Sequence, residues 1–215
     1  MPHRFLFATV FLALLMGGGG MVAQEVIDRV AARVENDIIL VSDIRDLARY
    51  QMLMEGKSES DAQILDRLID QWIVRNEATV SRYPQPSDEE AQRSLARLTR
   101  TFSSPEEFEE RRQQSGLSRE ELLAIVKSEL YLRNYLDTRF RPAIQIEEKD
   151  VEGFYKTRVV PRAESRGQTP PTFEAAREFI QEALVQQAID EQAERWLKES
   201  RSRIRVETLL SENKP

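Results

Sequence analysis

The stretch that decides the fold is residues 172–210, TFEAAREFIQEALVQQAIDEQAERWLKESRSRIRVETLL. It follows Pro170 and Pro171. Proline is excluded from the interior of a helix, but a helix can start directly after it. Thr172 is a suitable N-cap. Apolar residues then recur every three to five positions, so we expect one apolar helix face. These residues are Phe173, Ala176, Ile180, Leu184, Ile189, Ala193 and Trp196. The pattern predicts a helix over residues 172–203, about 45 Å long at ~1.5 Å per residue, along which several other helices pack.

The period changes after this helix. Ile204, Val206 and Thr208 alternate with charged residues, which is typical of a half-buried strand. A single strand needs a partner, and the best candidate lies near the other end of the chain. We therefore expect the last strand to pair with the first, so that the long helix holds the two ends of the protein together.

That partner is a predicted β-hairpin over residues 26–40. Apolar and polar side chains alternate in its first half, and the turn falls at residues 35–37. Asn36 and Asp37 are the turn residues that tolerate a positive φ. With the C-terminal strand added, the chain ends form a small three-stranded antiparallel sheet.

The region between the chain ends is predicted to be helical, which makes the fold class mostly α (α+β). Ser42 is the expected N-cap of a first helix that stops at Gly56, and a second helix starts near Ser60. Three further helices start at S-x-x-E capping boxes. The boxes are Ser87 with Glu90, Ser104 with Glu107, and Ser118 with Glu121. A short helix is expected over residues 148–156, and residues 159–171, with three prolines, are expected to form a loop.

Residues 1–23 have the three parts of a secretory signal peptide. A basic start with Arg4 precedes an apolar run over residues 5–16, and small residues follow up to Ala23. The run is shorter than the ~20 residues of a membrane span, so we expect cleavage near Ala23. An uncleaved membrane anchor is the alternative. After cleavage, residues 24–215 form one unit, with an N-terminal part (24–158), the loop (159–171) and the C-terminal helix and strand (172–215).

The composition excludes several functions. The formal net charge is −6, which argues against nucleic-acid binding because that binding depends on neutralising phosphates. There is no cysteine, and the one histidine, His3, lies within the predicted signal peptide. This removes the usual nucleophilic triads and zinc sites, and no glycine-rich phosphate loop is present. The carboxylate pairs are interpreted as helix caps and solvated faces, so we predict no enzyme activity, no metal and no cofactor.

Three further motifs occur in a fixed order: residues 26–44 (VIDRVAARVENDIILVSDI), residues 65–70 (LDRLID) and residues 147–155 (EEKDVEGFY). Their order and spacing resemble those of the SurA-type periplasmic chaperones. The C-terminal helix and strand match in order and character, so the resemblance covers nearly all of residues 24–215. It implies an ATP-independent periplasmic chaperone that holds unfolded outer-membrane or exported polypeptides, without stable membrane insertion after signal cleavage.

One departure from that family concerns catalysis. Most members carry a parvulin-type prolyl isomerase domain before the long C-terminal helix. Here residues 156–171 number only 16, well below the ~50 that a domain needs. The resemblance therefore implies the chaperone part alone, which agrees with the absence of an expected enzyme site. There are two rival interpretations. One is an adaptor subunit with one fixed partner, which a survey of clients would distinguish from a chaperone. The other is a prolyl isomerase, which the short link disfavours.

A holdase needs apolar groups that a client can reach. Flexible methionines suit promiscuous binding, and large apolar patches are unusual on inert monomers. The candidates are Tyr50, Met52 and Met54 at the end of the first helix, with Phe102 and Phe108 beside a short connection. We expect the first three to be partly exposed if they line a client groove. The alternative for each is an ordinary place in the core.

Overall fold

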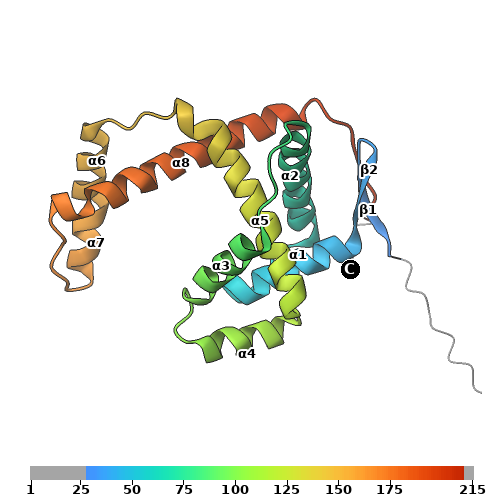
Figure 1. Cartoon of the computed structure of the whole chain (residues 1–215), viewed down its shortest axis with the longest axis horizontal. Helices are drawn as coiled ribbons and strands as arrows, with labels where there is room; N and C mark the ends of the chain where they lie inside the picture. Colours follow the sequence, from blue (N-terminus) through green and yellow to red (C-terminus); the bar gives the residue numbers. More distant parts are fainter. Residues whose placement is uncertain (1–27, 211–215) are drawn as a thin grey trace, which may run out of the picture.

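The computed structural model describes residues 28–210. It is mostly α-helical with a small antiparallel sheet and a long C-terminal helix, as predicted (Figure 1). The predicted signal peptide lies outside the described residues. Among residues 28–210, no helix has both the length and the apolar character that a membrane crossing needs.

The sheet joins the two ends of the described chain. Strands β1 (Val30–Val34), β2 (Asp37–Leu40) and β3 (Val206–Thr208) lie in the order β2-β1-β3, and both pairings are antiparallel. The predicted pairing of the last strand with the first is thus confirmed. The turn prediction was wrong in detail, because Glu35 takes the positive φ of 51°. The two-residue loop between the paired Val34 and Asp37 places Glu35 first, where the turn needs that conformation.

The helices of the N-terminal part start where the capping residues predict. Ser60, Ser87, Ser104 and Ser118 each accept a hydrogen bond from the backbone N–H three residues later. The elements are α1 (Val41–Glu55), α2 (Asp61–Val80), α3 (Asp88–Thr99), α4 (Pro105–Ser115), α5 (Arg119–Phe140) and the 3-10 turn η1 (Arg141–Ala143).

The start of α1 differs from the prediction. Ser42 lies inside the helix, and the N-cap is Leu40, because β2 runs directly into α1. Leucine has no side-chain acceptor for a cap. The Asp43 carboxylate instead accepts a 2.8 Å hydrogen bond from the Leu40 N–H at the start of the helix. The predicted stop is present, since Gly56 ends α1 in the left-handed conformation (φ 72°).

The region before the long helix is more helical than predicted. Helix α6 (Glu148–Phe154) continues through the π-helical turn η2 (Tyr155–Val159) into α7 (Val160–Ser165), so the loop expected over residues 159–171 is shorter than predicted. The cause is Pro161, whose ring would meet the Thr157 carbonyl in a regular α-helix. The turn before it is widened instead, and the Val160 N–H donates to the Tyr155 carbonyl, five residues back.

The long helix α8 (Phe173–Arg201) has two buried faces instead of the single one predicted. Ile180 and Ile189 are both fully buried, yet nine residues amount to about two and a half turns, so they lie on opposite sides of the helix. Ile180 packs with Val151 of α6, whereas the later part of α8 contacts α5 and α2 (Figure 1). We call residues 146–188 the arm and the remaining described residues the body.

Three apolar clusters hold the body together. The first lies between the sheet, α1 and α2, the second between α1, α3, α4 and α5, and the third between α2 and α5. Trp196 of α8 packs against the first and third clusters, so the end of α8 is part of the body. Arg141 links arm and body through ion pairs of 2.7 Å to both Asp137 and Glu182.

Candidate functional site

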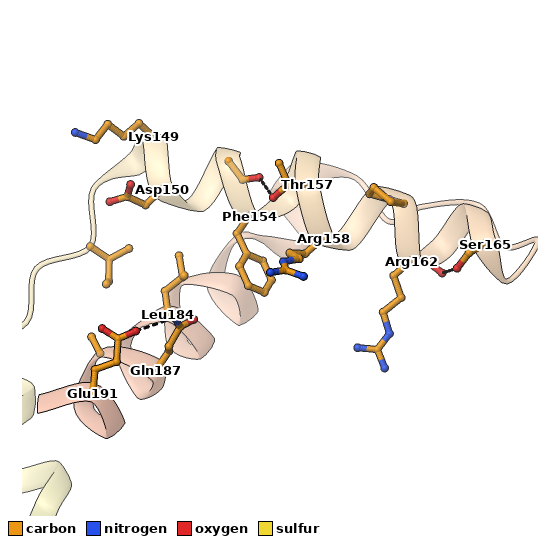
Figure 2. A pocket seen from close by; sticks show the side chains of 14 residues that line it. Lys149, Asp150, Phe154, Thr157, Arg158, Arg162, Ser165, Leu184, Gln187 and Glu191 are labelled. Carbon is orange, nitrogen blue, oxygen red and sulfur yellow. Dashed lines mark hydrogen bonds between the residues drawn. The ribbon is translucent and has the colours of Figure 1, made fainter. Parts of the chain in front are cut away.

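The candidate site is a groove in the arm. Its volume is about 1130 Å³, and it lies between the continuous α6–α7 helix and α8 (Figure 2). We call it the arm groove. Its lining residues are Ile146, Lys149, Asp150, Gly153, Phe154, Thr157, Arg158, Pro161, Arg162, Ser165, Leu184, Gln187, Ala188 and Glu191.

The walls of the groove are held by a small core of their own. Val151, Ala176 and Ile180 are buried between α6 and α8. At the far end, the Tyr155 hydroxyl donates a 2.6 Å hydrogen bond to the Pro171 carbonyl, and its ring meets Phe173 edge to face at 5.5 Å. These contacts fix the π-helical turn η2 relative to the start of α8, and with it one wall of the groove.

The floor of the groove is apolar. Phe154 and Leu184 are half-buried and project from the two walls toward one another (Figure 2). Gly153 adds free space beside them, because a Cβ at this position would meet nothing within 4 Å. The floor can therefore cover an apolar side chain of a second polypeptide, and such burial releases about 25 cal/mol per Å².

The rims carry charges of both signs. Arg158 and Arg162 point into the groove from the α7 side, while Asp150 and Glu191 lie toward its other end (Figure 2). The Gln187 amide donates a 2.9 Å hydrogen bond to Glu191 and holds that carboxylate in place. Lys149 pairs with Glu147 at 2.7 Å, so its charge is already compensated.

The groove offers apolar and charged contacts to a second molecule. Within residues 28–210, no group of three or more His, Cys, Asp or Glu side chains is arranged to hold a metal ion. The charged side chains of the groove lie on its exposed rims. Reversible binding of a polypeptide is the function that this arrangement can supply.

The site residues predicted from the sequence lie elsewhere, at the far end of α1. Met54, Phe102 and Phe108 are half-buried around a cluster that contains Tyr50 and Leu53. The rings of Phe102 and Phe108 meet edge to face at 5.3 Å, and the Arg111 guanidinium lies 5.6 Å from the centre of the Phe102 ring.

Two of the predicted residues differ sharply in exposure. Tyr50 is only 9% exposed and its hydroxyl donates to Glu129 at 2.7 Å, so the expectation that it is partly exposed was wrong. Met52 is 41% exposed. The structure brings four of the five predicted residues together and leaves Met52 outside.

None of the residues of the arm groove was predicted as a site residue. The available signal was the pair Arg158 and Arg162, four residues apart and so one turn apart on a helix. That signal was missed because residues 159–171 were predicted to form a loop. In a loop, a spacing of four residues does not place two side chains on the same face.

Comparison with known proteins supports the predicted resemblance. The chain is 26% identical over 151 residues to Chaperone SurA of Pseudomonas fluorescens (strain Pf0-1), an alignment that covers 66% of this chain. The chain spans about a third of that relative, since the match covers 35% of its length. No protein-family model matches the chain.

Proposed function

We propose that this protein is an ATP-independent chaperone of the holdase type, which binds unfolded polypeptides in the arm groove. The observation that carries the proposal is the groove itself, which is apolar at its floor and ringed by charge. The similarity to Chaperone SurA points to the same class of function.

Reversible holding follows from the physics of such a groove. An unfolded client exposes apolar side chains, and covering one of them with Phe154 and Leu184 removes apolar surface from water. A groove open to solvent buries only part of each segment, so individual contacts stay weak and the client can leave without ATP. The mixed rim charges hold the flanking backbone near the floor without selecting one fixed sequence.

The clients we propose are unfolded outer-membrane or exported proteins, met in the periplasm after export guided by the predicted signal peptide. Barrel precursors suit this role because their strands alternate apolar and polar residues. We further propose that the protein needs no cofactor and does not isomerise prolyl bonds. Only residues 166–172 separate α7 from α8, so the chain passes directly from one wall of the groove to the other. Met52, Met54, Phe102 and Phe108 are proposed as secondary client contacts.

Filling the groove tests the proposal. In Gly153→Trp the new ring would occupy the groove, and because its Cβ meets no neighbour the fold should tolerate it. We expect the variant to lose most of its ability to suppress aggregation of an unfolded barrel precursor diluted from urea, measured by light scattering.

The matched control is Gly153→Ala. It shares the gain in helix propensity, about 0.8–1 kcal/mol relative to glycine, but leaves the groove open. It should therefore unfold at a slightly higher urea concentration and hold clients like the parent. Equal holding by the tryptophan and alanine variants would show that clients bind elsewhere, and a parent protein that suppresses no aggregation would refute the holdase function.

A further inference from the structure

Two guanidinium groups in the arm groove stand without an internal partner. Arg158 and Arg162 lie one turn apart on the same wall, and no carboxylate of residues 28–210 lies within ion-pair distance of either. Two other cations of the arm do have a carboxylate partner, since Arg177 contacts Glu148 at 2.7 Å and Lys156 contacts Glu152 at 3.0 Å. The groove thus keeps two positive charges available for a second molecule.

The charges of the groove are also separated along its length. Asp150 precedes Arg158 by eight residues, which is about 12 Å of helix, and Glu191 lies at the same end as Asp150 (Figure 2). Phe154 and Leu184 lie between the acidic end and the basic end. A bound segment therefore meets an apolar floor with a positive field on one side only.

We propose that the arm groove selects polypeptide segments in which large apolar residues are flanked, on one side, by carboxylates. This inference rests on the proposed function and specifies which client segments the groove takes. The apolar side chains cover Phe154 and Leu184, and the carboxylates pair with Arg158 and Arg162. Arginine suits this role because its planar guanidinium can bind a carboxylate through two parallel hydrogen bonds. A segment with lysines in the same place brings like charges together and is rejected.

Direct peptide binding to the full chain tests this selectivity. The probes are short fluorescent peptides that share a Phe-Leu centre and differ only in one flanking pair. The pair is Glu-Glu, Gln-Gln or Lys-Lys. Each pair is placed on the N-terminal side of the centre in one peptide and on the C-terminal side in another. Fluorescence anisotropy should give a Kd about ten-fold lower for the best Glu-Glu peptide than for its Lys-Lys counterpart, a factor that corresponds to 1.4 kcal/mol. The preference should shrink as salt is raised from 0.05 to about 0.5 M, because these rims are exposed.

Charge reversal identifies the residues responsible. Arg158→Glu with Arg162→Glu should invert the preference, so that the Lys-Lys peptide binds more tightly. The matched control is Arg93→Glu with Arg97→Glu, an equally spaced exposed pair on α3 with the same change in net charge. It should leave the preference of the parent unchanged.

The outcomes separate this inference from the proposed function. Equal affinity of all the peptides for the parent, no binding of any of them, or the same shift in both double variants would overturn the charge selectivity. Suppression of barrel-precursor aggregation is measured in parallel on the same samples. If the parent suppresses aggregation without a peptide preference, the holdase function stands and the selectivity fails. If the parent shows the peptide preference but does not suppress aggregation, the selectivity stands and the holdase function fails.

Discussion

At the scale of single residues, the contact between Tyr50 and Glu129 shows how a predicted binding residue became a structural one. The hydroxyl of Tyr50 donates a 2.7 Å hydrogen bond from α1 to the Glu129 carboxylate on α5. Burial raises the pKa of the Glu129 carboxyl, and the Tyr50 hydrogen bond and Arg133 oppose that rise. Burial, followed by the nearby Glu129 charge, raises the pKa of Tyr50 as well. The tyrosine is therefore the donor that makes a half-buried carboxylate tolerable.

Removing this donor should have a pH-dependent cost. Tyr50→Phe is expected to lower the free energy of unfolding at pH 7.5 by about 1–3 kcal/mol, because a half-buried carboxylate loses its partner. The pKa of Glu129 in the folded state is already above its ordinary value of 4.5, and losing the hydrogen bond raises it further. A folded-state pKa raised above the unfolded one costs stability at high pH, and this cost disappears as the pH falls below 4.5.

Urea unfolding at pH 7.5 and pH 4.0 checks this expectation. The difference in free energy of unfolding between the parent and Tyr50→Phe should be less than half as large at pH 4.0 as at pH 7.5. The control is Tyr83→Phe, whose hydroxyl contacts Thr138 at 3.2 Å and no carboxylate, so its effect should be similar at both pH values. A difference for Tyr50→Phe that does not change with pH would contradict the role assigned to Glu129.

At the scale of elements, α8 changes its buried face halfway along. Ala176 and Ile180 face the α6–α7 helix, while Ile189, Ala193 and Trp196 lie on the opposite side toward the body. The same helix thus belongs to two cores. This division places the arm groove beside the body without adding to the body core.

Truncating one residue on each face should separate the two cores. Ile180→Ala and Ile189→Ala each remove a fully buried side chain, with an expected local cost of about 2–5 kcal/mol. Because Ile180 packs only within the arm cluster, its loss should reduce hydrogen-exchange protection in residues 148–165 and leave α2 and α5 protected. Ile189→Ala should instead reduce protection in α2 and α5. Identical protection maps for the two variants, measured by mass spectrometry, would argue for one undivided core.

At the scale of the whole molecule, the two ends of the described chain are joined. Strand β3 pairs with β1, and Glu35 and Arg205 exchange two hydrogen bonds, of 3.0 Å from the Glu35 N–H and 2.6 Å from the Arg205 N–H. Arg201 at the end of α8 adds ion pairs to Asp66 and Asp70 on α2, at 3.2 and 3.5 Å. The body is therefore closed by its last residues.

Deleting residues 206–215 should destabilise the whole body. The deletion exposes one edge of β1 and uncovers Ala31, Ala32 and Val34, which are fully buried in the intact protein. We expect a lower urea midpoint for the entire body, not a local loosening of the tail. Deletion of residues 211–215 alone is the control. The pairing would prove unimportant for stability if both truncations unfolded at the midpoint of the parent.

The sequence by itself determined the features that depend on neighbours along the chain. The serine caps at Ser60, Ser87, Ser104 and Ser118 mark helix starts, because the side chain and the amide that it caps are three residues apart. Gly56 marks the end of α1 because the left-handed conformation strains other residues. The change of period after α8 also revealed β3, and the hairpin near the other end of the chain was the best candidate to pair with it.

The tertiary structure alone decided which surfaces are covered. Pro161 lies within a helix because the π-helical turn before it absorbs the proline, and the loop expected there becomes one wall of a groove. Tyr50 is buried by α5, and Phe154 faces Leu184 across 30 residues of sequence. The local sequence shows whether a side chain is apolar or charged. Whether that side chain is buried depends on elements that are distant in the chain. The groove could be seen only after packing had placed α6 and the π-helical turn η2 against α8 and left Arg158 and Arg162 without an ion-pair partner among the described residues.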